Sequence, residues 1–327
     1  MPRKARLDSP GALHHVMARG IERRNIFQDE GDRKSFVERM VKLVDETKTR
    51  ILAWALLDNH IHLLIISGPC GLSTFMRRLL TGYAYFFNRK YQRSGHLFQN
   101  RYKSIICDLD RYLLELVRYI HLNPLRSGMV KDLEGLEKYP WCGHGVLTGR
   151  QKNDWQERDF VLVFLAKKEK RAVRLYRDFM EAGKDQGGRP ELVGGGLVRS
   201  MGGWSRVLSL RRMGELERHD DRILGEGHFV EGILEEADQK LARQIRARRE
   251  MRSLSRIIKE KCQEAGINEA ELRSGSRRRA VSELRKGICF FLNRDLGISM
   301  AEIARQVGVG TTGVAMAIKE GEKIKQN

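Results

Sequence analysis

The chain of 327 residues is 41% hydrophobic and 31% charged, which allows more than one domain with a buried core. Its 61 lysines and arginines exceed its 42 acidic residues, and the net charge of +19 predicts nucleic acid rather than an anionic membrane as partner. No apolar run approaches the roughly 18 residues that span a bilayer, the basic N-terminus lacks a secretion core, and the five cysteines form no C-x-x-C pair, so we expect a cytoplasmic protein without disulfides.

Short apolar runs alternate with longer stretches of helical spacing over the first third of the chain. Strands are predicted at Ala12–Ala18, Ile51–Leu57, Ile61–Ile66 and Tyr102–Cys107, and helices at Asp29–Lys48, Leu72–Gln92 and Asp108–Leu122. The last helix stops before Asn123-Pro124, because proline cannot continue a helix. This β-α-β-β-α-β order predicts an α+β fold, a ferredoxin-like antiparallel sheet with helices on one face.

The remainder of the chain is expected to be helical. Ser299–Val307 and Thr311–Lys319 flank the turn Gly308-Val309-Gly310, a pattern typical of an all-α helix-turn-helix domain. We therefore predict an α+β domain at residues 1–150, a helical linker region of uncertain role at 151–245, and a helix-turn-helix domain at 246–327.

His60 and His62 stand two residues apart at the start of a predicted strand. Residues at that spacing share a face, so both imidazoles point the same way while Ile61, Leu63 and Ile65 point into the core. Two such imidazoles can bind Mg²⁺, Mn²⁺ or Zn²⁺ when a third group joins them. The alternative is a polar sheet face that binds no metal.

Tyr119 and Asn123 lie four residues apart and so share one side of the third helix. A phenol beside a metal can attack phosphorus, although its intrinsic pKa of about 10 means that it needs activation. Asn123 could complete the metal shell with its amide oxygen. The alternative for Tyr119 is an aromatic side chain that packs between helix and sheet.

Three ordered motifs in this region resemble the REP-associated tyrosine transposases, a domesticated branch of the transposases that mobilise single-stranded insertion sequences. They are NHIHLL at 59–64, GHLFQNRYK at 95–103 and RYIHLNPLR at 118–126, and the resemblance covers about residues 8–150. It implies an HUH nuclease domain in which His60, His62 and Asn123 hold Mg²⁺ or Mn²⁺. Tyr119 would become joined to a 5′-phosphate while cutting and rejoining single-stranded or hairpin DNA, such as repeated extragenic palindromes (REP), without ATP.

Basic side chains accompany these motifs, and grouped around one site they are suited to phosphate contacts. The candidates are Arg19, Arg23, Arg24, Arg101, Lys103, Arg118 and Arg126. His96, Phe98 and Tyr102 could stack on unpaired bases, although Phe98 could equally belong to the core.

Residues 251–320 resemble the DNA-binding domain of the bacterial replication initiator DnaA. The basic loop with Arg277, Arg278 and Arg279 and the helix that begins at Thr311 and Thr312 carry this resemblance, which implies a duplex DNA partner. The acidic-histidine pair that usually precedes the threonines is replaced by Val309-Gly310, so no base preference is implied. The alternative is a small helical module that binds another protein.

Two other functions are compatible with these residues. A non-catalytic DNA-binding regulator could retain a transposase fold, and a metal phosphohydrolase could use water instead of Tyr119. The sequence is equally compatible with a monomer and with a homodimer that exchanges the tyrosine between subunits.

Overall fold

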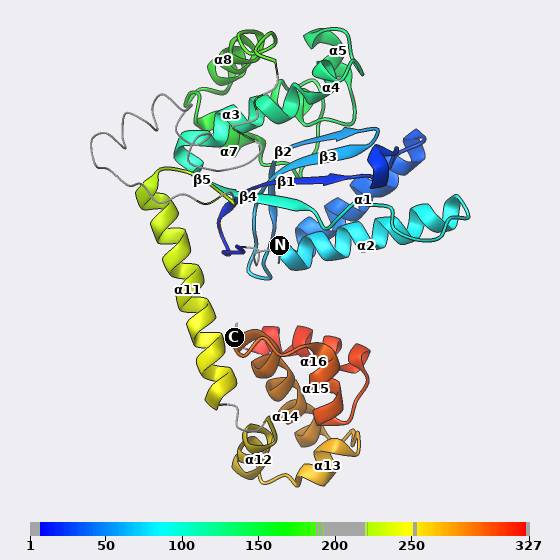
Figure 1. Cartoon of the computed structure of the whole chain (residues 1–327), viewed down its shortest axis with the longest axis vertical. Helices are drawn as coiled ribbons and strands as arrows, with labels where there is room; N and C mark the ends of the chain where they lie inside the picture. The colour runs from blue at the N-terminus through cyan, green and yellow to red at the C-terminus, as the bar shows by residue number, and fades with distance from the viewer. Residues whose placement is uncertain are drawn as a thin grey trace. The chain divides into compact units, whose positions relative to one another are not determined.

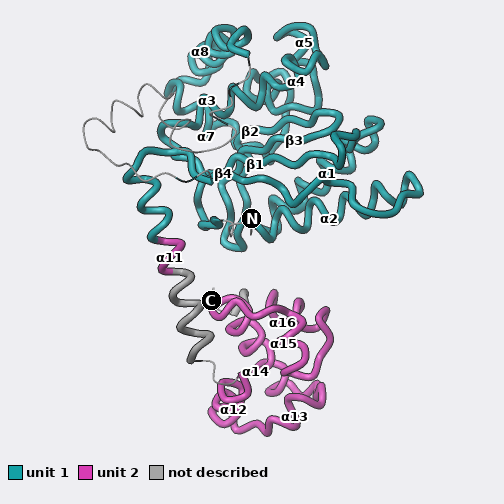
Figure 2. The backbone as a smooth tube through the Cα atoms, in the orientation of Figure 1, with its two compact units in different colours: residues 1–235 teal, residues 236–327 magenta. Residues whose placement is uncertain are grey.

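The computed structural model describes residues 7–187, 189, 192, 220, 222–250 and 254–324, and of 240–250 and 322–324 only the backbone. The chain divides into two compact units, residues 1–235 and 236–327 (Figure 2). The boundary falls within helix α11 (Gly227–Glu250). Among the described helices, none combines the length and apolar character needed to cross a membrane.

Five strands form a single sheet in the first unit. They are β1 (Leu13–Arg19), β2 (Arg50–Leu57), β3 (His60–Ile66), β4 (Lys103–Cys107) and β5 (Ile223–Leu224), arranged in the order β2-β3-β1-β4-β5. The first four pair antiparallel, and β5 is added parallel to β4. The predicted strand–helix order is present along β1 to β4. Strand β5 was not predicted, because two residues are too few to show an alternation.

Helices α1 (Glu30–Thr47) and α2 (Leu72–Lys90) cover one face of the sheet, the lower face in Figure 1. Their apolar stripes share a buried cluster with Ile61, Leu63 and Ile65 of β3, as the alternation in that strand predicted. At the N-terminus of each helix a carboxylate accepts hydrogen bonds from backbone amides of the first turn. Asp29 accepts a hydrogen bond from the Asp32 amide at 2.9 Å, and Asp8 accepts from the first two amides of α2.

The opposite face is also covered, so the expectation of helices on one face only was wrong. Its helices are α3 (Leu109–His121), α4 (Asn123–Arg126), α5 (Leu133–Lys138), α6 (His144–Leu147), α7 (Arg158–Val163) and α8 (Glu169–Glu181). Side chains of α3, α7 and α8 share a buried cluster with Leu52 and Leu64 of the sheet. The nearly continuous apolar run of β2 explains this cover, because both faces of that strand must be buried.

The second unit contains only helices where it is described. They are α12 (Leu254–Glu264), α13 (Glu269–Arg273), α14 (Arg279–Phe290), the π-helical turn η3 (Phe291–Asp295), α15 (Met300–Val307) and α16 (Thr311–Ile324). Gly308 ends α15 with φ +69°, and a Cβ there would lie 1.8 Å from the Arg273 carbonyl oxygen. Only glycine suits both demands, which fixes the short turn between α15 and α16.

Candidate functional site

The sheet places His60 and His62 on the face that packs against α3. Their ring centroids lie 5.1 Å apart, and in the antiparallel register His62 pairs with Met17 and His60 with Arg19 of β1. The alternation that turns Ile61 toward α1 and α2 therefore turns both imidazoles the other way. The predicted shared face of the two histidines is the arrangement found.

Helix α3 brings Tyr119 to the same place. Its ring lies edge-on to His62 with centroids 5.7 Å apart, and 5.8 Å from the ring of His15 on β1. Asn123 follows one turn later and donates from Nδ2 to the Tyr119 carbonyl oxygen at 2.9 Å. That bond fixes the amide, so Oδ1 is the Asn123 atom that could bind a cation.

A cavity of about 430 Å³ joins these side chains. Its wall includes His60, His62, Tyr119 and Asn123, the polar residues Gln99 and Asn100, and the cations Arg19, Arg101 and Lys103. Arg19, Arg101 and Lys103 are exposed, which leaves their charges accessible to an anionic ligand. Four residues predicted for chemistry and three predicted for phosphate contact thus share one cavity.

Both imidazoles are held in their uncharged form. Burial, followed by the nearby charge of Arg19, lowers the pKa of His60 to about 4. Burial also lowers the pKa of His62 well below its ordinary value, with His15, His60 and Arg19 acting in the same direction. A neutral imidazole has a lone pair that a metal ion can use.

The donor set fits a divalent cation that accepts nitrogen and amide oxygen. Within the part of the chain that the structure describes, no cluster of three or more His, Cys, Asp or Glu side chains is placed to hold a metal. Asn123 lines the same cavity as the two imidazoles and could supply an amide oxygen as a third donor. His60, His62 and Asn123 would hold such an ion, and it would supply polarisation of a bound phosphate.

Arg126 lies beside the tyrosine. Its Cζ is 5.6 Å from the centre of the Tyr119 ring, and its guanidinium donates to the Tyr119 and Gly183 carbonyl oxygens at 3.4 Å each. Burial lowers the pKa of Arg126, whereas Tyr119 acts to raise it.

Four of the predicted DNA contacts in the first unit, Arg126 among them, do not line the cavity. Arg118 is buried, pairs with Glu115 at 2.8 Å and stacks on Phe179, so its charge is used inside the protein. Arg23 and Arg24 are exposed in the turn after β1, where Arg24 pairs with Glu22 at 2.8 Å. Neither arginine contributes to the wall of the cavity.

The predicted contacts of the second unit are accessible. Arg277, Arg278 and Arg279 are exposed at the start of α14, and Arg278 pairs with Glu271 at 3.2 Å. Thr311 and Thr312 are exposed in the first turn of α16.

Sequence reasoning missed His15. Its Nε2 lies 3.1 Å from His62 Nδ1, and its Nδ1 lies 3.0 Å from the Leu192 carbonyl oxygen. The signal was present, because His15, Met17 and Arg19 alternate along β1 on the face that carries the histidine pair of β3. Reading residues 12–18 only as an apolar run concealed it.

Comparison with known proteins gave a family match over the first part of the chain. Residues 10–123 match the model of the family described as "Transposase IS200 like", so this part of the chain is transposase-like in sequence. The match includes His60, His62, Tyr119 and Asn123. A search of curated proteins gave no match.

Among solved structures, the chain is similar to a REP-associated tyrosine transposase bound to a REP hairpin. The two are 17% identical, the alignment covers 48% of this chain and 98% of the other, and the TM-score is 0.39.

Proposed function

We propose that the chain is a metal-dependent endonuclease and strand transferase that cuts single-stranded or hairpin DNA through Tyr119. The observation that carries the proposal is the convergence of Tyr119 with two neutral imidazoles in a cavity that also holds Asn123 and exposed cations. In this proposal the β-α-β-β-α-β core is a ferredoxin-like HUH domain. The match to a transposase family over the same residues supports it.

The reaction follows from the positions of the side chains. Arg19, Arg101 and Lys103 would bind the phosphate, and the Tyr119 hydroxyl would lose its proton to solvent. The phenol oxygen then bonds to phosphorus, the bond from phosphorus to the 3′-oxygen breaks, and that oxygen takes up a proton. The products are a 5′-phosphotyrosine and a free 3′-OH, and reversal on another strand completes strand transfer.

The test is incubation of the full chain with a labelled hairpin oligonucleotide and Mn²⁺ or Mg²⁺. We expect a protein–DNA adduct that survives denaturation, is absent with a chelator and is absent in Tyr119→Phe. Tyr112→Phe on the same helix is the matched control and should retain the adduct. If DNA were cleaved without an adduct, and cleavage persisted in Tyr119→Phe, the protein would be a phosphohydrolase that uses water. If DNA were bound but not cleaved, the protein would be a regulator.

The Tyr119 ring lies 5.7 Å from the ring of His62 in the same chain, so we propose that Tyr119 acts within its own subunit. A mixture of the Tyr119→Phe and His60→Ala variants should then remain inactive. Restored cleavage in the mixture would show that subunits exchange the tyrosine.

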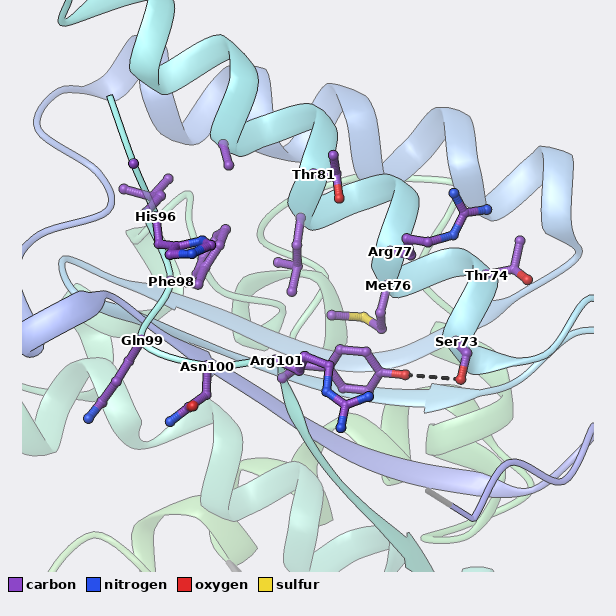
Figure 3. Close-up of a pocket in the computed structure, with 15 residues that line it drawn as sticks. Ser73, Thr74, Met76, Arg77, Thr81, His96, Phe98, Gln99, Asn100 and Arg101 are labelled. Carbon is purple, nitrogen blue, oxygen red and sulfur yellow. Dashed lines mark hydrogen bonds between the residues drawn. The ribbon is translucent and has the colours of Figure 1, made fainter. Parts of the chain in front are cut away.

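A second cavity, of about 760 Å³, offers a place for unpaired nucleotides (Figure 3). It lies between α2 and residues 95–102 and shares Gln99, Asn100 and Arg101 with the catalytic cavity. The exposed His96 could stack on a base, whereas Tyr102 is buried and donates to Ser73 Oγ at 3.4 Å. A 2-aminopurine base beside the cut site should lose its fluorescence quenching in His96→Ala.

We further propose that α15 and α16 form a helix-turn-helix that binds duplex DNA. The exposed Thr311 and Thr312 at the start of α16 would contact base edges, and Arg277 to Arg279 would contact phosphates. A tethered second module raises the effective concentration of DNA at the first. Replacing the three arginines with alanine should weaken binding to a hairpin flanked by duplex but leave binding to an isolated hairpin unchanged.

A further inference from the structure

The two imidazoles of the catalytic cavity each have a hydrogen-bond partner at Nδ1. His62 Nδ1 lies 3.1 Å from His15 Nε2, and His60 Nδ1 lies 2.6 Å from Asn59 Oδ1. We propose that His15 and Asn59 are positioning residues that hold both imidazoles in the Nδ1–H tautomer, so that both Nε2 lone pairs are available to a divalent cation. The cation itself rests on the proposed function.

The proton on His15 can be inferred from its other partner. His15 Nδ1 lies 3.0 Å from the Leu192 carbonyl oxygen, and a carbonyl only accepts, so Nδ1 carries the proton. The ring is fully buried, which favours the uncharged form with a single proton. His15 Nε2 is then an acceptor. His62 must therefore donate from Nδ1, and its own Nε2 keeps the lone pair.

The amide of Asn59 is oriented in a comparable way. Its Nδ2 donates to the Arg23 carbonyl oxygen at 3.1 Å, so its Oδ1 is the atom that faces His60 Nδ1. Oδ1 can only accept, which requires a proton on His60 Nδ1. His60 Nε2 is therefore also left with its lone pair.

The turn that holds Asn59 is itself specialised. Glu22 and Arg23 have φ of +52° and +62°, a left-handed conformation that is unfavourable for residues with a side chain. This turn presents the Arg23 carbonyl to the Asn59 side chain, and the Gly20 amide donates to the Asn59 carbonyl at 2.8 Å. Hydrogen bonds therefore hold both the main chain and the side chain of Asn59 in place.

Two separate hydrogen-bond chains therefore give the same result. One runs from Leu192 through His15, and the other from the turn at Arg23 through Asn59. If either His60 or His62 were protonated at Nε2 instead of Nδ1, that Nε2 would have no lone pair to offer a divalent cation. Partners of this kind orient metal-bound imidazoles in many proteins, and their loss lowers metal affinity by about 10-fold to 100-fold.

The first test reads the tautomers without metal. In the full chain labelled with ¹⁵N-histidine, long-range proton–nitrogen spectra should show His60 and His62 protonated at Nδ1 and unprotonated at Nε2. Assignment would use the loss of one signal set in His60→Asn and in His62→Asn. Protonation at Nε2 in either ring of the unaltered protein would overturn the proposal, whatever the activity of the enzyme.

The second test measures Mn²⁺ affinity by calorimetry. His15→Phe and Asn59→Ala should each weaken binding by about 10-fold to 100-fold. His15→Gln and Asn59→Asp keep an acceptor for the neighbouring imidazole and should restore most of the affinity. His14→Phe is the matched control, because His14 is also buried but belongs to neither hydrogen-bond chain.

The outcomes separate the two proposals. A folded His15→Phe protein with unchanged Mn²⁺ affinity would contradict the positioning role of His15. Unchanged affinity in a folded Asn59→Ala protein would likewise contradict the positioning role of Asn59. If the unaltered chain bound no Mn²⁺, the proposed metal-dependent function would fail, while the spectra would still decide the tautomers. If His15→Phe did not fold, the spectra and His15→Gln would remain decisive.

Discussion

Two groups of histidines lie on the α3 side of the sheet, and they differ in what their rings face. His15, His60 and His62 lie together, and the last two line the catalytic cavity beside Tyr119. His121 and His144 are enclosed, and both direct Nδ1 to the Tyr176 hydroxyl, at 2.7 and 2.8 Å. Burial lowers the pKa of histidines in both groups. A lowered pKa therefore does not distinguish the two groups, whereas an open cavity and a neighbouring tyrosine do.

The largest difference between the groups should appear in cleavage. His60→Ala removes a proposed metal ligand and should lower the cleavage rate by on the order of 100-fold or more. His144→Ala should leave the rate of the folded protein within about 3-fold of the unaltered chain, a change of under about 1 kcal/mol in the barrier. Gel assays on the hairpin substrate measure both. Equal losses in the two variants would remove the functional distinction between the groups.

The free energy of unfolding should fall more when the enclosed group is altered than when a cavity histidine is altered. Tyr176→Phe removes the hydroxyl that both enclosed rings bond, and leaving buried polar groups unpaired costs about 1 to 3 kcal/mol. His60 is only partly buried, so His60→Ala should cost less. All four tryptophans lie within residues 1–235, so tryptophan fluorescence during denaturation reports on this unit. A larger loss for His60→Ala than for Tyr176→Phe would contradict the assignment.

Acid should lower the free energy of unfolding of the protein through the enclosed histidines His121 and His144. Burial, with the charge of Arg177, lowers the pKa of His144 from 6.5 to about 3. Below pH 6.5 the unfolded chain binds a proton that the folded chain does not, so the free energy of unfolding falls as the pH falls from 6.5 toward 3.

For one such histidine the slope is roughly 1.4 kcal/mol per pH unit. His144→Gln should flatten the pH dependence of unfolding measured by tryptophan fluorescence. An unchanged slope in this variant would show that His144 is not the group responsible.

The sequence predicted the active face of the sheet better than its surroundings. Alternation in β3 and helical spacing are local, so they placed the histidine pair on a strand and Tyr119 on a helix, whereas Asn123 lies at the start of the separate helix α4. The role of His15 depends on pairing between β1 and β3 and on Leu192, which lies 177 residues away. Contacts of that range leave no periodic trace in a sequence. Helix α3 was predicted as an element, but its packing on the second face of the sheet, like that of α7 and α8, depends on contacts of similar range and was not.

The DNA-contacting arginines were predicted from their charge alone, because the sequence does not show which of them are buried. Arg101 is exposed at the catalytic cavity, whereas Arg118 is 7% exposed and paired with Glu115. Arg101→Ala should weaken hairpin binding several-fold and reduce the slope of log affinity against log salt by about 1, since one phosphate contact is lost. Arg118→Lys keeps the charge but not the stacking on Phe179, so it should lower stability and leave the salt slope unchanged. Fluorescence anisotropy at several salt concentrations measures both slopes. If the slope fell for Arg118→Lys and not for Arg101→Ala, the phosphate path would lie near α8 and not along the catalytic cavity.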